Sequence, residues 1–243
     1  MIYVSISTIP QRIKNLNKSI ESLLNQTRKP DKIFVNIPYK YKRFKETIED
    51  DQISKFNNSI VEVTRCEDYG PGTKLLGSLN KLKKDSLLIL ADDDHTYENY
   101  MIEKFFYFYS KAPNNAYSFY VHSLGDFGVG QGADGFAINS NSLGGVKKFY
   151  DEVVEPNKDL FIHDDLWTSF FLFYVKKVKI LSLQSHLTKT ANNETSLIYK
   201  KHSQDNGLIE SYGKNINEAV RNRDQIAMKS LEYMFSKISQ IKF

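Results

Sequence analysis

Residues 86–94 read SLLILADDD, a run of apolar residues that ends directly in three aspartates. A short apolar run of this length predicts a buried β-strand. Such strands are typical of the parallel sheets of α/β proteins, in which ligands bind beyond the carboxyl ends of the strands. The sequence therefore predicts three carboxylates at the edge of the sheet where such folds bind their ligands.

The rest of the chain alternates between short apolar runs and stretches of helical period. Before residue 86 we expect strands at 2–6, 33–37 and 60–63, and helices at 13–24 and 73–82. After residue 94 we expect strands at 116–121, 135–138 and 178–183, and helices at 97–111, 139–154, 164–175 and 216–238. This order predicts a single α/β domain over residues 1–243, with a mixed, mostly parallel sheet between helices.

The composition narrows the class of protein. The chain has 243 residues and a formal net charge of +4, and its basic residues are mostly scattered lysines, which argues against a nucleic-acid-binding protein. Cys66 is the only cysteine, so no intramolecular disulfide can form and a reducing compartment is favoured. No stretch has the ~18 apolar residues that a membrane span requires. We therefore expect a cytoplasmic protein without a membrane span.

The three aspartates Asp92, Asp93 and Asp94 repel one another and resist burial, so they do not stabilise a strand end. A divalent cation such as Mg²⁺ or Mn²⁺ would neutralise them, because it binds one or two carboxylates together with substrate phosphates. The alternative is an acidic helix start, in which Asp94 caps the next helix. We favour the metal site because the triple acid follows an apolar strand.

Two other segments offer ligand-binding groups. Residues 68–74, DYGPGTK, follow the third expected strand, and their glycines, helix-start N–H groups and Lys74 suit a phosphate. A tight turn capped by Thr73 explains this segment equally well. Residues 163–167, HDDLW, open an apolar helix and are either a helix cap or a second wall of the site, in which a carboxylate acts as general base.

Two segments are more ambiguous. The glycine-rich residues 125–135 are either a loop that lies against a ligand or a plain hairpin connection. Residues 38–56 interleave basic and aromatic side chains, a pattern that can bind phosphates or bases. We interpret them as a solvated surface and assign them no chemistry.

Taken in order, these segments resemble the nucleotide-sugar-dependent glycosyltransferases of the GT-A fold, specifically the family-2-like group. The opening residues 4–12, VSISTIPQR, with the following helix and residues 30–33, are similar to the first βα unit of that family. Residues 92–94 match its Asp-x-Asp motif, and residues 163–165 fall where it carries a Glu-Asp-type motif. The resemblance extends over about residues 2–190.

The resemblance implies a nucleoside-diphosphate sugar as donor, with UDP assumed as its nucleotide, and a hydroxyl acceptor such as a glycan. Asp94 would bind Mn²⁺ or Mg²⁺, and Asp165 would be the general base of an inverting hexosyl or deoxyhexosyl transfer. Asp164 stands where the family usually has Glu. The other implied donor-binding residues are Thr8, Pro10 and Arg12 in the nucleotide pocket, Asp68 and Lys74 at the base and diphosphate, Asp92 at the ribose, and Asp93.

The same resemblance divides the chain into a nucleotide-binding part (1–95), an acceptor and catalytic part (96–190) and a C-terminal helical extension (191–243). The aromatic residues of the expected helix 97–111 are compatible with core packing or with a homodimer. Two other functions stay open. The acids could serve a nucleotidyl or phosphoryl transferase with two Mg²⁺ ions, or a nucleotide- or carbohydrate-binding protein without turnover.

Overall fold

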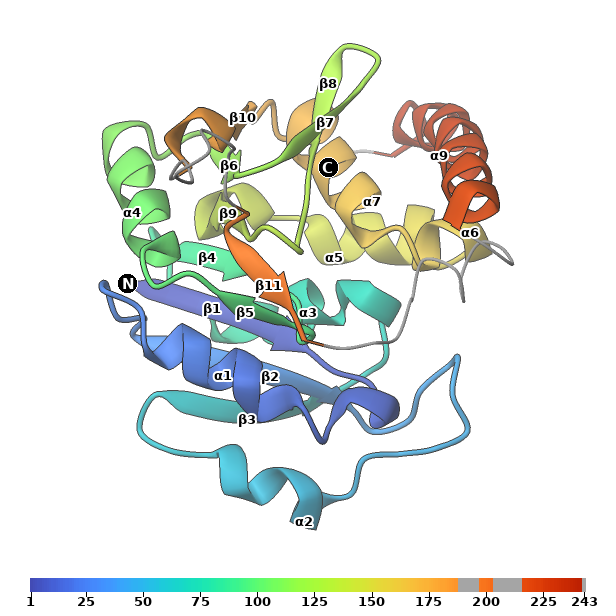
Figure 1. Cartoon of the computed structure of the whole chain (residues 1–243). Helices are drawn as coiled ribbons and strands as arrows, with labels where there is room; N and C mark the ends of the chain where they lie inside the picture. Colours follow the sequence, from blue (N-terminus) through green and yellow to red (C-terminus); the bar gives the residue numbers. More distant parts are fainter. Residues whose placement is uncertain (188–196, 203–215, 242–243) are drawn as a thin grey trace.

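The computed structural model describes residues 1–187, 197–202 and 216–241. A seven-stranded sheet in the order β10-β6-β9-β4-β1-β2-β3 forms its centre (Figure 1). The strand expected at 86–91 is β4 (Leu87–Leu90), which lies in the middle of this sheet with all its residues buried. That position explains its uninterrupted apolar sequence, because both faces of a central strand are covered.

The sheet is mixed and mostly parallel, as expected. On one side β4 is parallel to its neighbour β1 (Ile2–Ser7), and the parallel part of the sheet continues from β1 through β2 (Lys32–Pro38) and β3 (Val61–Cys66). On its other edge β4 pairs with the antiparallel strand β9, and the sheet continues there through β9 (Phe136–Asn139), β6 (Ala116–Ser118) and β10 (Ile180–Ser182). The carboxyl ends of β1 to β4 therefore lie along one edge.

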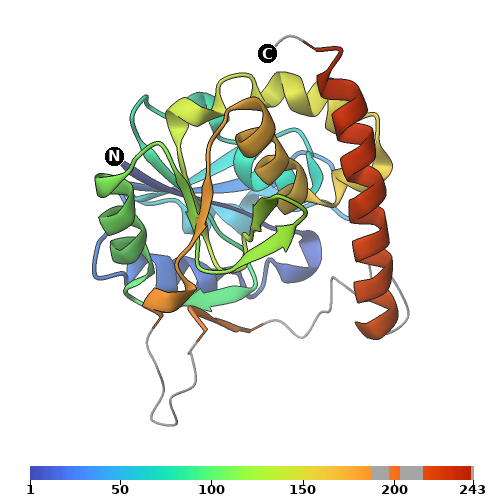
Figure 2. The same cartoon turned by 90° about the horizontal axis from the view of Figure 1, so that it is seen from above.

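Alternate residues of β4 point into two hydrophobic cores on opposite faces of the sheet. Helices α1 (Leu16–Leu24) and α4 (Met101–Lys111) contribute to one core. The other core contains residues of α3 (Thr73–Leu76), α5 (Val146–Phe149), α6 (Lys158–Phe161), α7 (Asp164–Phe170) and α9 (Ile216–Ile238). Figure 2 shows α9 running along one side of the molecule.

The region after the acidic triplet differs from the prediction of one helix over 97–111. Residues His95–Tyr97 form a short strand, β5, and α4 begins only at Met101. Strand β5 pairs in an antiparallel manner with β11 (Tyr199–Lys201), from the part of the chain expected to be a helical extension. A partner about 100 residues away along the chain leaves no local signal, which is why the sequence did not indicate it.

Other expected elements are altered in detail. The helices expected at 139–154 and 164–175 both continue into π-helical turns, in which Glu155 N–H donates to the Tyr150 carbonyl and Lys176 N–H to the Phe171 carbonyl. Such i→i+5 turns keep a helical apolar pattern, so periodicity does not distinguish them from an α-helix.

The glycine-rich segment forms a hairpin of β7 (Val121–Leu124) and β8 (Phe127–Gly130). The segment expected to be a solvated surface contains a short helix, α2 (Asp50–Ile53).

Apart from Tyr107, which is exposed, the aromatic residues around α4 pack within the chain itself. Tyr97 and Phe105 are buried, and the partly buried members pack against the same core: Tyr100, Phe106, Phe108 and Tyr109. Core packing therefore accounts for this aromatic set, and the homodimer stays a prediction. No helix among the described residues is long and apolar enough to span a membrane.

Candidate active site

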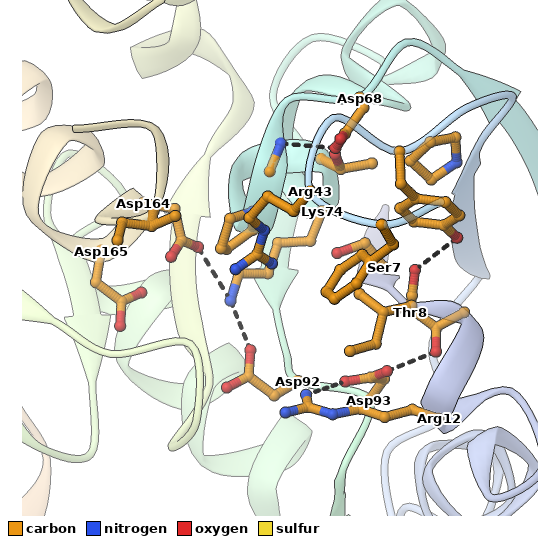
Figure 3. A pocket seen from close by; sticks show the side chains of 18 residues that line it. Ser7, Thr8, Arg12, Arg43, Asp68, Lys74, Asp92, Asp93, Asp164 and Asp165 are labelled. Atoms are coloured by element: carbon orange, nitrogen blue, oxygen red, sulfur yellow. Dashed lines mark hydrogen bonds and ion pairs between the residues drawn. The ribbon is translucent and has the colours of Figure 1, made fainter. Parts of the chain in front are cut away.

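A cavity of about 580 Å³ lies at the carboxyl ends of β1, β2, β3 and β4 (Figure 3). This is the edge at which open α/β sheets bind their ligands. The cavity brings together residues from distant parts of the sequence, and the predicted site residues that line it are Thr8, Arg12, Asp68, Lys74, Asp92, Asp93 and Asp165. Pro10 and Asp94 are not among its lining residues: Pro10 opens the short turn Pro10–Arg12, and Asp94 is buried beside Arg12.

Lys74 connects the two acidic segments. Its Nζ lies 2.5 Å from Asp92 Oδ1 and 3.1 Å from Asp164 Oδ2, and its side chain is only 7% exposed. Burial disfavours the charged ammonium group, but the attraction of Asp164 and Asp92 outweighs it and raises the pKa of Lys74 well above its usual value. Lys74 is therefore a fixed positive charge between the end of β4 and the start of α7.

Close packing of the surrounding backbone holds Lys74 in contact with Asp92 and Asp164. Ser5 Oγ donates to the Lys74 carbonyl at 2.5 Å, which ties α3 to β1. A Cβ atom at Gly72 would lie 2.6 Å from Trp167 Cζ2, so glycine lets α7 approach α3. A Cβ at Gly132 would collide with Lys74 Nζ, so the 132–135 segment lies directly against the ion pair.

Asp165 lies beside this pair, at the start of α7. Its Oδ1 accepts a hydrogen bond from Gly132 N–H at 2.9 Å. Burial and the neighbouring charge of Asp164 raise the pKa of Asp165 well above its usual value, although Lys74 acts in the opposite direction. A carboxyl group with a raised pKa accepts a proton more readily than an ordinary aspartate, which is the property that a general base requires.

Asp93 organises the residues that follow β1. It accepts hydrogen bonds from Thr8 Oγ1 at 2.5 Å and from Arg12 Nη1 at 2.9 Å. Burial raises the pKa of Asp93, and the contacts with Arg12 and Thr8 oppose this effect. The middle aspartate of the triplet thus orients the side chains of Thr8 and Arg12 at the wall of the cavity.

Asp92, Asp94 and His95 together could hold a metal ion, because one ligand atom from each lies within 4.8 Å of the others. Asp94 Oδ1 and His95 Nδ1 are buried 2.7 Å apart, and neither has a hydrogen-bond partner of suitable geometry among the described residues. Burial would raise the pKa of Asp94, but His95, Arg12 and Lys201 outweigh it and lower that pKa. The donor set of two carboxylates and an imidazole fits a divalent cation.

The segment from Pro38 to Phe44 also reaches the cavity, which corrects its interpretation as a solvated surface. Tyr41, Arg43 and Phe44 line the cavity, and Figure 3 shows Arg43 extending toward Lys74. Tyr41 donates its hydroxyl hydrogen to the Thr8 carbonyl at 2.9 Å. The interleaved basic and aromatic side chains were the available signal, but they do not by themselves distinguish a cavity wall from an exposed loop.

Asp68, in the loop after β3, also holds the segment from Pro38 to Phe44 in place. Its Oδ2 accepts the Lys42 N–H at 2.6 Å, and its Oδ1 accepts the Gly70 N–H at 2.8 Å. Gly70 has φ +61°, a conformation that favours glycine, and a Cβ there would lie 2.6 Å from the Phe161 carbonyl oxygen. The buried carboxylate of Asp68 therefore joins the loop after β2 to the loop after β3.

The C-terminal part of the chain contributes a second group that the sequence analysis missed. Lys201 Nζ lies 3.6 Å from Asp94 Oδ2. The next residue, His202, donates its backbone N–H to the Asp94 carbonyl at 2.9 Å, and its Nε2 lies 2.9 Å from Ser19 Oγ. The pairing of β11 with β5 brings these residues to the acidic triplet, and no local pattern in the sequence indicates it.

His163, immediately before α7, is expected to make stability depend on pH. Burial lowers its pKa to about 4, whereas an unfolded histidine titrates near pH 6.5. Below about pH 6.5 the unfolded chain therefore binds a proton that the folded chain does not, so stability falls as the pH is lowered. At pH 5 this loss amounts to about 2 kcal/mol of unfolding free energy.

Urea unfolding of the wild type and of His163→Gln at pH 7.5 and pH 5 measures this effect. The difference in unfolding free energy between the two proteins should change by about 2 kcal/mol between these pH values. His122→Gln, at an exposed histidine, serves as the control and should keep the pH dependence of the wild type. An equal pH dependence in His163→Gln would contradict the assignment.

The mixed, mostly parallel sheet, with its cavity at the ends of the parallel strands, has the architecture of the GT-A fold. A mannosyltransferase of Pyrobaculum calidifontis, solved with GDP-Man and Mn²⁺, matches all of this chain and 65% of its own chain, with a TM-score of 0.60 and 10% identity. S. aureus TarS in complex with UDP-GlcNAc matches 97% of this chain and 72% of its own, with a TM-score of 0.51 and 13% identity.

A third match is the 2-C-methyl-D-erythritol 4-phosphate cytidylyltransferase (IspD) of Francisella tularensis. It covers 84% of this chain and 94% of its own, with a TM-score of 0.52 and 13% identity. No protein-family model and no curated protein sequence matches the chain. At these identities the comparisons establish the fold, and they confirm the α/β architecture that the sequence predicted.

Proposed function

We propose that this protein is a metal-dependent glycosyltransferase that moves a sugar from a nucleoside-diphosphate sugar to a hydroxyl group of an acceptor. The observation that carries the proposal is the contact of Lys74 with both Asp92 and Asp164, with Asp165 beside it, at the wall of the sheet-edge cavity. A positive charge beside a carboxyl group of raised pKa suits a reaction that releases an anion and removes a proton.

The cavity offers separate surfaces for the parts of a nucleotide sugar. Tyr41 and Phe44 offer aromatic surface for a base or ribose, next to Asp68. Arg43 and Lys74 offer positive charge to a diphosphate. Under this proposal residues 1–95 bind the nucleotide, and residues 96–190 contribute Asp165 and the acceptor side. UDP is the first nucleotide to test, with GDP beside it, because the similar structures carry UDP-GlcNAc and GDP-Man.

Asp92, Asp94 and His95 are the residues that would hold Mn²⁺ or Mg²⁺. Bound there, the cation would supply positive charge to the diphosphate of the donor. The similar mannosyltransferase was solved with Mn²⁺, which supports the choice of ion. Asp93 would act indirectly, because its carboxylate positions Thr8 and Arg12 at the donor side.

The proposed reaction is a direct displacement. Asp165 accepts the proton of the acceptor hydroxyl as its oxygen bonds to the anomeric carbon of the donor sugar. The bond between that carbon and the diphosphate oxygen breaks, and the electron pair leaves with the nucleoside diphosphate. Lys74 and Arg43 stabilise the negative charge that develops on this leaving group. Attack from the face opposite the leaving group inverts the configuration of the anomeric carbon.

A nucleotidyltransferase is the second candidate, because the cytidylyltransferase has the same fold and its match covers 94% of its own chain. The two reactions release different products. A glycosyltransferase releases a nucleoside diphosphate from a nucleotide sugar, whereas a cytidylyltransferase releases pyrophosphate from CTP. Product analysis with both kinds of substrate therefore separates the two functions.

Calorimetric titration with UDP and GDP, with and without Mn²⁺, tests the proposal directly. We expect Mn²⁺ to raise the affinity for one of these nucleotides at least tenfold, and the Asp94→Asn variant to lose this gain, because a neutral amide is a poor ligand for a hard cation. Release of nucleoside diphosphate from the matching nucleotide sugars is then measured in the presence of Mn²⁺.

Asp51→Asn is the matched control, since Asp51 is an exposed aspartate of α2, and it should bind nucleotide and metal as the wild type does. Absence of nucleotide binding in the wild type, with or without metal, would refute the proposed function. Nucleotide binding that does not respond to Mn²⁺ or to Asp94→Asn would refute the metal site alone.

A further inference from the structure

A second cavity, of about 470 Å³, is also lined by the Asp164–Asp165 pair. It is formed where the β7–β8 hairpin, the start of α7 and the helix α9 meet. Ile162, Asp164 and Asp165 line both cavities. Its volume is within the range of small-molecule sites. The carboxyl group proposed as general base therefore borders both cavities, and a molecule bound in the second cavity would lie next to Asp165.

The lining of the second cavity combines apolar and polar side chains. The apolar surface comes from the hairpin, α7 and α9, through Leu124, Val129, Leu166, Ala227 and Met228. Gln131, Arg223 and Asp224 add hydrogen-bonding groups. Apolar patches for ring C–H groups next to amide, guanidinium and carboxylate groups for hydroxyls suit a polyhydroxylated ring.

The charges of this cavity disfavour an anionic ligand. Arg223 is the only lysine or arginine among its described lining residues, against the carboxylates Asp164, Asp165 and Asp224. Arg223 Nη2 is also 3.0 Å from Asp224 Oδ1, so its charge is compensated within α9. Burial lowers the pKa of His163 to about 4, so this lining histidine is neutral near pH 7. Asp164 is itself paired with Lys74, so a phosphate or carboxylate would meet no uncompensated positive charge here.

We infer that this second cavity binds the acceptor, and that the acceptor is a neutral sugar whose preference over acidic sugars is set by the C-terminal helix α9. The inference rests on the proposed function, because it assigns the hydroxyl that Asp165 would deprotonate. It gives residues 223–228 of α9 a role in substrate selection. Leu231 and Met234, both buried in the core, anchor this helix one to two turns farther along.

Acceptor competition with charge-changed variants tests the inference. The probes are neutral methyl glycosides of glucose, galactose and N-acetylglucosamine, and the methyl glycoside of glucuronic acid. With the nucleotide sugar that the wild type hydrolyses as donor, we expect transfer to a neutral glycoside at least tenfold more efficient than to the glucuronide. Asp224→Lys should shift that ratio at least tenfold toward the glucuronide, because it places a positive charge at the cavity.

Glu232→Lys is the matched control. Glu232 is an exposed acid of the same helix that does not line the cavity, and its replacement changes the charge by the same amount. This variant should keep the ratio of the wild type. A wild-type preference for the glucuronide, a ratio that Asp224→Lys leaves unchanged, or donor hydrolysis with transfer to neither kind of glycoside would overturn the inference.

Failure of the inference differs from failure of the proposed function. If the wild type binds neither UDP nor GDP and hydrolyses no nucleotide sugar, the proposed function itself is wrong. If nucleotide binding and donor hydrolysis are normal while the acceptor ratio does not follow the charge at position 224, only the acceptor assignment is wrong.

Discussion

Replacing Asp165 by asparagine is expected to lower the rate of sugar transfer by about 10³-fold, within the range for loss of a general base. Asparagine keeps an oxygen that can accept the Gly132 N–H, so the start of α7 and the 132–135 segment should stay in place. An amide does not take up the acceptor proton. The variant should therefore bind nucleotide as the wild type does but fail in the chemical step.

Single-turnover kinetics measure the rate of sugar transfer, and calorimetric titration measures the nucleotide affinity. Asp159→Asn, which changes an exposed acid in the first turn of α6, is the control and should retain the full rate. Asp164→Asn removes a partner of Lys74 rather than the base, so it should reduce nucleotide affinity as well as rate. If Asp165→Asn transfers sugar at the rate of the wild type, Asp165 is not the general base, whatever the results for the other variants.

Lys74→Met is expected to destabilise the folded chain by about 3–5 kcal/mol at pH 7, because removal of one partner leaves buried charges uncompensated. The methionine side chain has a length similar to that of lysine but cannot neutralise Asp92 and Asp164. Lys74 also opposes the rise in the pKa of the neighbouring Asp165, so without Lys74 that pKa should be raised further in the folded state. An acid whose pKa is raised by folding gains stability as the pH falls, so the variant should recover part of the loss between pH 7 and pH 4.5.

Urea unfolding at both pH values measures this recovery, and nucleotide titration of the variant measures the loss of its diphosphate contact. Lys81→Met is the control: Lys81 pairs with Glu62 at the surface, with side-chain exposures of 34% and 37%. An exposed pair contributes no more than about 1 kcal/mol. An equal loss of unfolding free energy in Lys74→Met and Lys81→Met would show that burial does not make the ion pairs of Lys74 more stabilising than an exposed pair.

The residues at the strand ends could be predicted from the sequence because each follows a local pattern. The apolar run before Asp92 identified β4, and parallel strands carry their ligand groups at one edge, so the acids and Lys74 were expected at one site. Most expected strands and the long C-terminal helix are present in the structure. The resemblance to GT-A glycosyltransferases pointed to the same edge of the sheet.

Other parts of the site depend on contacts between residues far apart in the chain. The role of Tyr41, Arg43 and Phe44 as cavity wall follows from the hydrogen bond between Lys42 N–H and Asp68, which local composition does not reveal. Likewise, Lys201 reaches Asp94 only because β11 pairs with β5. In both segments the same polar residues would suit an exposed loop.

By itself, the sequence determined where most of the strands and the long C-terminal helix lie, since hydrophobic periodicity acts over a few neighbouring residues. Only the tertiary structure decided that Lys74 bridges Asp92 and Asp164, that His95 joins the possible metal ligands, and that α9 closes a second cavity against Asp165. These relations arise when distant segments pack together, and packing distances are not encoded in any local pattern of residues.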